Sequence, residues 1–253
     1  MTVSLTYNSF SLMTNGVIIT DFNGSLPRRI ALNDIEMRHG KILVGSPVLD
    51  ARRIPLSGSI VADDETTLRA RIRAFGKAMG IGGAAKFNLY SDYYVMARVE
   101  NFTRRPKLLT GLLWEWSLDL VCDDPFWTAE TPTTDATVVV TSPKTWTHDN
   151  EGTYLVYPVL TLTAPTGALG VTNPRYTNST TGKFAEFTGT LAPGATVVMD
   201  MGKGLVTIGG VSYLNYFNGS FISLSPDDNS MSFSWTGDTP TQTMVYRKRH
   251  IED

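Results

Sequence analysis

Residues 112–127 read LLWEWSLDLVCDDPFW, and the stretch from Leu112 to Cys122 alternates in polarity. One set of alternate positions is apolar and holds Leu112, Trp114, Trp116, Leu118, Leu120 and Cys122. The set between them is mixed and holds Leu113, Glu115, Ser117, Asp119 and Val121. Because successive side chains of a strand point to opposite faces, this pattern predicts a strand with one face in a core. We expect the mixed face to be wet or to form an interface.

The end of this stretch, CDDPFW, combines the only cysteine of the chain with two carboxylates and two aromatic residues. A thiol nucleophile is disfavoured, because adjacent acids tend to raise a thiol pKa and reactive thiolates favour cationic surroundings. We therefore predict a buried, inert cysteine, a strand ended by the acids and the proline, and a turn anchored by the aromatic pair. The predicted domain boundary comprises Cys122, Asp123, Asp124, Pro125, Phe126 and Trp127.

One helix is predicted N-terminal to this strand. Asp63 or Asp64 can cap it, and Glu65 adds negative charge to its first turn. Its apolar residues recur at helical spacing and are Leu68, Ile72, Phe75 and Met79. Gly80 supplies the stop signal. The pattern predicts an amphipathic helix that packs on a sheet.

The composition and the hydrophobic pattern of the sequence change near residue 128. Residues 123–135 are dense in Pro, Thr and Asp, which marks a linker. Beyond it, short strand patterns recur about every ten residues without a helix. We predict a mainly β chain with a β-sandwich-like, one-helix domain at 1–127, a linker at 128–135 and a β-sandwich at 136–253.

Composition excludes several classes of protein. The chain has 253 residues and a net charge of −2, so no strong field attracts polyanions. Residues 1–127 carry 15 basic and 13 acidic residues, and residues 128–253 carry 7 and 11. One cysteine excludes an internal disulfide. The N-terminal MTVSLTYNSFSLMTNGVIIT lacks a signal-peptide pattern, and no apolar run is long enough to span a membrane. We expect a soluble protein made in a cytoplasm.

No motif indicates catalysis, a metal or a cofactor. The glycine-rich GIGGA (80–84) follows a helix instead of opening one, so it lacks the geometry of a phosphate loop. The three histidines, His39, His148 and His250, lie in polar stretches without metal-ligand spacing, and we expect each at the surface. No GxSxG elbow is present. We predict no catalytic, metal-binding or cofactor-binding residues.

Two features of the C-terminal half remain open. Its strand patterns carry Tyr213, Tyr216 and Trp235, which could form a stacking platform for a sugar or could lie in the core. The basic run in YRKRHIED (246–253) is compatible with a solvated tail or a subunit contact. The residues predicted for subunit contacts are Arg52, Arg53, Glu115, Asp119, Arg247, Lys248 and Arg249.

The order of several segments resembles the distal tail protein family of long-tailed bacteriophages. The N-terminal half carries RRIPLSGSI (52–60), TTLRARIRAFGKAM (66–79), YYVMARV (93–99) and LDLVCDDPFW (118–127). The C-terminal half carries NEGTYLVYPVLTLT (150–163), LAPGATVVMD (191–200), LSPDDNSMSFSW (224–235) and YRKRHI (246–251). One departure is Asp227, where the family's L-x-P-G-x-N turn has glycine. This change puts the geometry of that turn, but not the fold, in doubt.

The resemblance implies a structural protein of the virion tail tip. It implies a hexameric ring built by the N-terminal domain, with a galectin-like or jelly-roll C-terminal domain projecting outward. Such a ring connects the tail tube protein to the tail hub or tail-associated protein, and often carries receptor-binding or side-fibre proteins. DNA passes through its lumen without specific binding, and assembly occurs in the host cytoplasm without membrane insertion. The alternative is a carbohydrate-binding module that engages host glycans through the C-terminal sandwich.

Overall fold

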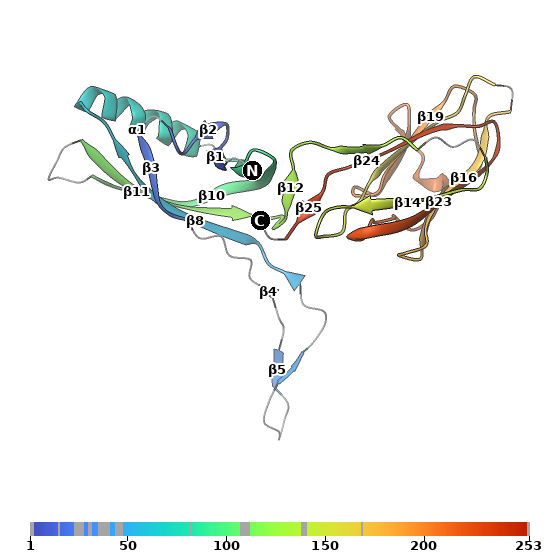
Figure 1. Ribbon diagram of the computed structural model, residues 1–253, viewed down its shortest axis with the longest axis horizontal. Coiled ribbons are helices and arrows are strands. Elements are labelled where there is room, and N and C mark those ends of the chain that lie inside the picture. Colours follow the sequence, from blue (N-terminus) through green and yellow to red (C-terminus); the bar gives the residue numbers. More distant parts are fainter. Residues whose placement is uncertain are drawn as a thin grey trace. The chain divides into compact units, whose positions relative to one another are not determined.

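The computed structural model forms two compact units (Figure 1). Unit 1 comprises residues 1–127 and unit 2 comprises residues 128–253. The residues that the structure describes are 3–14, 16–22, 28–29, 32–34, 41–43, 48–80, 82–106, 112–137, 141–167 and 169–251. The chain is mainly β, as predicted from the sequence, and the described residues contain one α-helix. No helix in this part of the chain is long and apolar enough to cross a membrane.

Unit 1 is built on an antiparallel sheet with a helix on one face (Figure 1). The order of its strands is β2 (Phe10–Ser11), β1 (Val3–Tyr7), β9 (Ala85–Tyr90), β10 (Tyr93–Pro106), β11 (Leu113–Cys122), β8 (Arg52–Val61) and β3 (Val17–Phe22). Two small ladders pair β4 (Arg28–Arg29) with β7 (Val48–Leu49) and β5 (Leu32–Asp34) with β6 (Lys41–Leu43).

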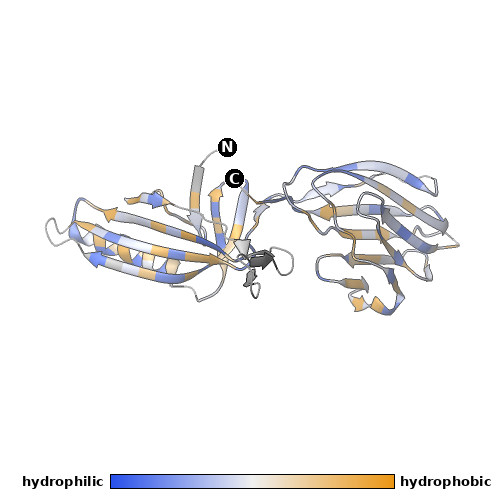
Figure 2. Ribbon diagram, turned by 90° about the horizontal axis from the view of Figure 1, so that it is seen from below, coloured by the Kyte–Doolittle hydropathy of each residue, from blue (hydrophilic) through white to orange (hydrophobic). Residues whose placement is uncertain are grey.

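The sequence explains why β11 lies inside the sheet. It pairs with β8 from Leu113 opposite Val61 to Cys122 opposite Arg52, and with β10 on its other side. The alternation predicted for this strand is confirmed, because Trp116, Leu118, Leu120 and Cys122 are all buried. Figure 2 shows the same alternation as orange and blue segments along the strands of unit 1.

Helix α1 (Glu65–Met79) covers the apolar face of this sheet. Asp64 is its N-cap, and its carboxylate accepts a hydrogen bond from the backbone N–H of Thr67 at 2.9 Å. Phe75 is buried and packs on Trp116, with ring centroids 4.9 Å apart. The predicted helix, its cap and its buried face are therefore confirmed.

Unit 2 is formed by two antiparallel sheets that share one core. The first has the order β13 (Thr133–Asp135), β24 (Thr241–Tyr246), β15 (Val159–Thr163), β19 (Thr196–Asp200), β20 (Leu205–Ile208) and β21 (Val211–Ser212). The second has the order β14 (Lys144–Asn150), β23 (Asp227–Gly237), β16 (Val171–Asn178), β17 (Lys183–Phe187) and β22 (Phe217–Gly219), with β18 (Thr190–Leu191) beside β16. A short 3₁₀ turn, η1 (Leu214–Tyr216), precedes β22.

Residues 128–135, predicted as a linker, contribute strands instead. β12 (Trp127–Ala129) pairs with β25 (Arg249–His250), and β13 pairs with β24. The guanidinium of Arg247 donates hydrogen bonds to the carbonyls of Ala129 and Glu130. The density of Pro and Thr therefore reflects two short strands, which pair with β25 and β24 near the C-terminus.

The turn at Asp227 keeps a conformation suited to glycine. Its φ angle is 63°, in the left-handed region, which aspartate tolerates better than most residues. The side chain of Asn229 closes the turn, because it accepts from the backbone N–H of Ser225 and donates to the carbonyls of Ser225 and Asp227, each at 2.9 Å. The substitution of glycine therefore leaves the turn intact.

Trp127→Ala should destabilise unit 1. This side chain is 1% exposed, packs 6.1 Å from Phe87 between ring centroids, and lies under the guanidinium of Arg52. Loss of so large a buried group costs about 3–5 kcal/mol of unfolding free energy. Urea unfolding followed by circular dichroism measures it. The control Tyr216→Ala, at a residue 44% exposed, should change stability little; equal effects of both substitutions would contradict the packing described.

Candidate functional site

The face of the unit 1 sheet opposite α1 is accessible and has a polar centre, with apolar residues such as Ile18 and Leu113 around it. We call it the outer face, and it is formed by Arg53, Ser57 and Ser59 of β8, Glu115, Ser117 and Asp119 of β11, Thr103 and Arg105 of β10, and Thr20 of β3. Its centre is a row of hydroxyl groups, because Ser117 lies opposite Ser57 on one side and Thr103 on the other. The row continues to Thr20, whose Oγ1 lies 3.4 Å from Oγ of Ser57.

A shallow groove of about 560 Å³ follows this hydroxyl row. Charged residues lie beside the row, since Glu115 pairs in register with Ser59 and with Arg105. Small side chains at the centre let another backbone approach closely, while the flanking charges can select its orientation. The arrangement suits contact with a protein surface better than enclosure of a small molecule.

The predicted subunit-contact residues of unit 1 divide into two groups. Arg53, Glu115 and Asp119 point to the outer face, and Arg53 forms an ion pair with Glu100 at 2.7 Å. Arg52 points the opposite way and is 5% exposed. Its Nε donates to the carbonyl of Pro125 at 2.7 Å. Arg52 is therefore a structural residue of unit 1, and its prediction as a contact residue is corrected.

The C-terminal basic run is engaged within unit 2. Arg247 donates to backbone carbonyls, Lys248 forms an ion pair with Glu151, and the guanidinium of Arg249 lies 6.0 Å from the ring centroid of Tyr154. These contacts, which the sequence prediction did not anticipate, hold the last strand in place. A subunit contact through Arg247 would first have to break them.

The boundary segment has the architecture predicted for it. Cys122 is fully buried, and burial, with added effects of Asp123 and Asp124, raises the pKa of its thiol to about 12 despite the nearby Arg52. Asp123 forms an ion pair with Arg98 at the surface. Phe126 and Trp127 are both buried. A thiol in this state is almost wholly protonated at neutral pH and is a poor nucleophile.

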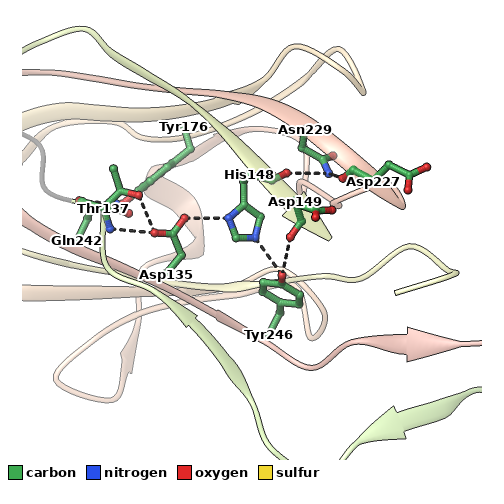
Figure 3. Close-up of polar contacts among 9 residues, drawn as sticks. All are labelled: Asp135, Thr137, His148, Asp149, Tyr176, Asp227, Asn229, Gln242 and Tyr246. Carbon is green, nitrogen blue, oxygen red and sulfur yellow. Dashed lines mark hydrogen bonds and ion pairs between the residues drawn. The ribbon is translucent and has the colours of Figure 1, made fainter. Parts of the chain in front are cut away.

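Unit 2 contains a buried polar network that the sequence pattern does not predict (Figure 3). His148 is 9% exposed, which corrects the prediction that it lies at the surface. Its Nδ1 lies 2.9 Å from a carboxylate oxygen of Asp135, and its Nε2 lies 3.0 Å from the hydroxyl of Tyr246. His250 is half-buried, and burial and then Lys248 lower its pKa, while His39 lies outside the described residues.

The network joins strands from both sheets. Asp135 belongs to β13, His148 to β14 and Tyr246 to β24. Asp135 also accepts hydrogen bonds from the backbone and hydroxyl of Thr137 at 2.9 and 2.6 Å. Since both ring nitrogens of His148 are engaged within the protein, neither is available to a substrate. The arrangement cross-links the sandwich and does not present a base.

The aromatic residues considered for sugar binding lie in two different environments. Trp235 is 7% exposed and stacks on Phe233 at 5.0 Å, so it belongs to the core and its prediction as a glycan contact is corrected. Tyr213 and Tyr216 remain together at η1, with ring centroids 5.7 Å apart. Tyr216 is 44% exposed and stacks on Phe187 at 5.8 Å.

Within the described ranges, no group of three His, Cys, Asp or Glu side chains is placed to hold a metal ion. Glu186 and Asn218 lie opposite each other on β17 and β22 and are joined by a hydrogen bond of 2.9 Å. The surfaces with functional potential are therefore the outer face of unit 1 and the Tyr213–Tyr216 surface of unit 2.

Tyr246→Phe should destabilise unit 2 by about 1–3 kcal/mol, because it leaves Nε2 of His148 without its partner. Burial, followed by the carboxylates of Glu151 and Asp149, raises the pKa of Tyr246 to about 12 from 10.0. The folded state therefore favours the protonated phenol. The contribution of this phenol to the unfolding free energy is complete below pH 10 and is lost as the pH rises towards 12. Urea unfolding measured from pH 8 to 12 tests both effects.

The Phe variant should lose the part of this pH dependence that Tyr246 contributes. Tyr216→Phe is the matched control, since that ring is exposed, and it should resemble the wild type at each pH. An unchanged unfolding free energy in Tyr246→Phe would show that the network contributes no stability.

Comparison with known proteins supports the fold described above. Residues 151–250 match the model of the family described as siphovirus-type tail component, C-terminal domain. No curated protein matches the sequence. The crystal structure of SPP1 Dit (gp 19.1), described as a paradigm of hub adsorption apparatus in Gram-positive infecting phages, has a TM-score of 0.74 at 17% identity. This likeness covers 98% of the present chain and 99% of the other.

The phage P2 baseplate in its activated conformation with Ca gives a TM-score of 0.46 at 7% identity, over 90% of this chain and 88% of that chain. This likeness is too weak to define a shared topology. The SPP1 Dit likeness extends over both units and establishes the fold, and the resemblance to distal tail proteins seen in the sequence is confirmed. Residues 151–250 therefore resemble the C-terminal domain of siphovirus-type tail components, and the whole chain shares the fold of SPP1 Dit.

Proposed function

We propose that the chain assembles into a closed ring through unit 1 and that this ring connects the tail tube to the tail-tip hub. The observation that carries the proposal is the outer face, a broad sheet surface with a polar centre that no described residue covers. The whole-chain likeness to a protein described as a hub adsorption apparatus supports the same role. Six copies are the number that the sequence resemblance implies, and a galectin-like unit 2 would project from the ring.

The chemistry of the outer face suits repeated contact between identical copies. A stable interface buries roughly 800 Å² on each partner, which the four long strands β3, β8, β11 and β10 can supply. Hydroxyl side chains lose little conformational entropy on burial and can exchange water for partner groups. The flanking charges of Arg53 and Glu115 then set register between neighbouring copies.

The proposed partners are the tail tube protein, the tail hub or tail-associated protein, and receptor-binding or side-fibre proteins. Residues 1–127 are close to neutral, so DNA can pass through the ring without the phosphate contacts that would retain it. The role requires no catalysis, in keeping with an inert Cys122 and a fully engaged His148. Assembly of the ring in the host cytoplasm completes the proposal.

Ser117→Arg should prevent ring formation, because it places a long charged side chain in the centre of the hydroxyl row. Size-exclusion chromatography with light scattering should give a mass several times that of one chain for the wild type and the mass of a monomer for the variant. Ser91→Arg, in an exposed turn of the same unit, should assemble like the wild type. A wild type that stays monomeric even with tail tube and hub proteins, or a fully assembled Ser117→Arg protein, would contradict the proposal.

A second candidate function is glycan binding by the Tyr213–Tyr216 surface. Exposed aromatic rings stack on sugar C–H faces, and the two tyrosine hydroxyls can exchange hydrogen bonds with those of a sugar. This surface retains two of the three aromatic residues that motivated the idea. It is compatible with the ring, since it lies on the other unit.

Tyr216→Ala should abolish binding to host envelope polysaccharides if this surface holds them. A glycan array probed with the full chain measures the binding, and thermal unfolding confirms that the variant is folded. Leu169→Ala removes an exposed apolar side chain elsewhere in unit 2 and should bind like the wild type. The candidate is wrong if the wild type binds no envelope polysaccharide or if Tyr216→Ala binds unchanged.

A further inference from the structure

A second groove lies in unit 2, and neither Tyr213 nor Tyr216 lines it. It has a volume of about 720 Å³ and is formed by the segment before β15, the start of β17, the turn between β19 and β20, and the segment after β22. Its main lining residues are Tyr157, Lys183, Gly202, Lys203, Ser220 and Phe221. We propose that this groove binds a sugar that carries a negatively charged substituent, such as a phosphate ester or a carboxylate.

The charge of the groove favours an anion. Lys183 has no hydrogen bond or ion pair with any described residue. Lys203 forms an ion pair with Asp200 at 3.2 Å, and Asp200 also accepts hydrogen bonds from two backbone N–H groups of the turn. The ammonium of Lys183 is therefore the uncompensated charge, in a half of the chain whose acidic residues outnumber its basic ones. An anionic substituent beside it would complete a charge-assisted hydrogen bond.

The aromatic side chains of the groove favour a sugar over a free anion. Tyr157 is 42% exposed at its edge. Phe221 stacks on Phe217 with ring centroids 4.6 Å apart and planes 8° apart. Gly204, with a φ angle of +66°, lies beside the ring of Phe221, and an added Cβ would be 3.4 Å from that ring. These contacts hold an apolar wall rigidly in place, against which the C–H groups of a sugar ring can pack.

The lining combines both kinds of contact within one groove. An inorganic phosphate ion could reach Lys183 but would leave the aromatic wall unused. A neutral sugar could pack on the wall but would leave the lysine unpaired. A charged sugar uses the lysine, the wall and the hydroxyl of Ser220, which has no hydrogen-bond partner among the described residues. The proposed ligand is a charged sugar because it can contact the lysine, the aromatic wall and the hydroxyl together.

Saturation-transfer NMR with the full chain tests this proposal, with glucose 6-phosphate, glucuronate and glucose as observed probes and inorganic phosphate as a competitor. The two charged sugars should bind, and glucose should bind about tenfold more weakly. Inorganic phosphate should displace glucose 6-phosphate only at a large excess. Raising the salt concentration should weaken binding of the charged sugars and leave that of glucose unchanged.

Three variants locate the site. Lys183→Gln should reduce binding of glucose 6-phosphate to the level of glucose, and Tyr157→Ala should weaken binding of all three sugars. Lys144→Gln is the matched control, because Lys144 is also half-buried but lies on β14, at the opposite edge of the same sheet. It should bind like the wild type. Thermal unfolding checks that each variant is folded.

The outcomes separate this groove from the Tyr213–Tyr216 surface. Binding of charged sugars that persists in Tyr216→Ala and falls to the level of glucose in Lys183→Gln supports the groove. Equal binding of glucose and glucose 6-phosphate, loss of binding in Tyr216→Ala with Lys183→Gln unaffected, or binding of inorganic phosphate as tight as that of its sugar ester would overturn the proposal. Absence of binding by any sugar would also overturn it, without bearing on ring assembly by unit 1.

Discussion

The pairing of β11 with β8 along its whole length, and with β10 from Trp114 to Val121, is the constraint on which unit 1 depends. Its inward residues from Trp116 to Cys122 are buried against α1 or the rest of the core, and Trp114 packs half-buried beside them. A slip of one residue would move all of them to the solvent side, so the register is strongly specified. The same alternation leaves Glu115 and Ser117 pointing outward. One sequence pattern thus builds the core and, on the reverse side of the sheet, the surface proposed for assembly.

Unit 2 relies on buried polar groups that fix its strands and turns. Asn150, Asn178 and Asn229 are fully buried, and each side chain bonds to backbone groups of a turn or loop. The His148 network links β13, β14 and β24 in the same manner. Such groups are costly to bury unless every one is satisfied, so they favour one arrangement of the two sheets. This structural role explains the buried polar residues of unit 2, which could otherwise suggest a catalytic site.

Features that depend on near neighbours could be predicted from the sequence. The cap at Asp64, the buried face of α1 and the inert state of Cys122 all follow from residues within a few positions. The roles of Arg52 and His148 could not, because their partners Pro125 and Tyr246 lie 73 and 98 residues away along the chain. Trp235 was ambiguous for a related reason, since strand alternation does not reveal which face another sheet covers. The groove at Lys183 likewise combines four separate segments of the chain, and no local pattern marks it.

In the proposed assembly, copies of the chain contact one another through the outer face of unit 1 in a phage tail. Electron cryomicroscopy of the particles that contain this chain would test that claim most directly. The account predicts a closed ring at the tip of the tail in which the hydroxyl row around Ser117 is buried between neighbouring copies. A ring in which this face remains bare to solvent, or particles whose tails lack the chain, would contradict it.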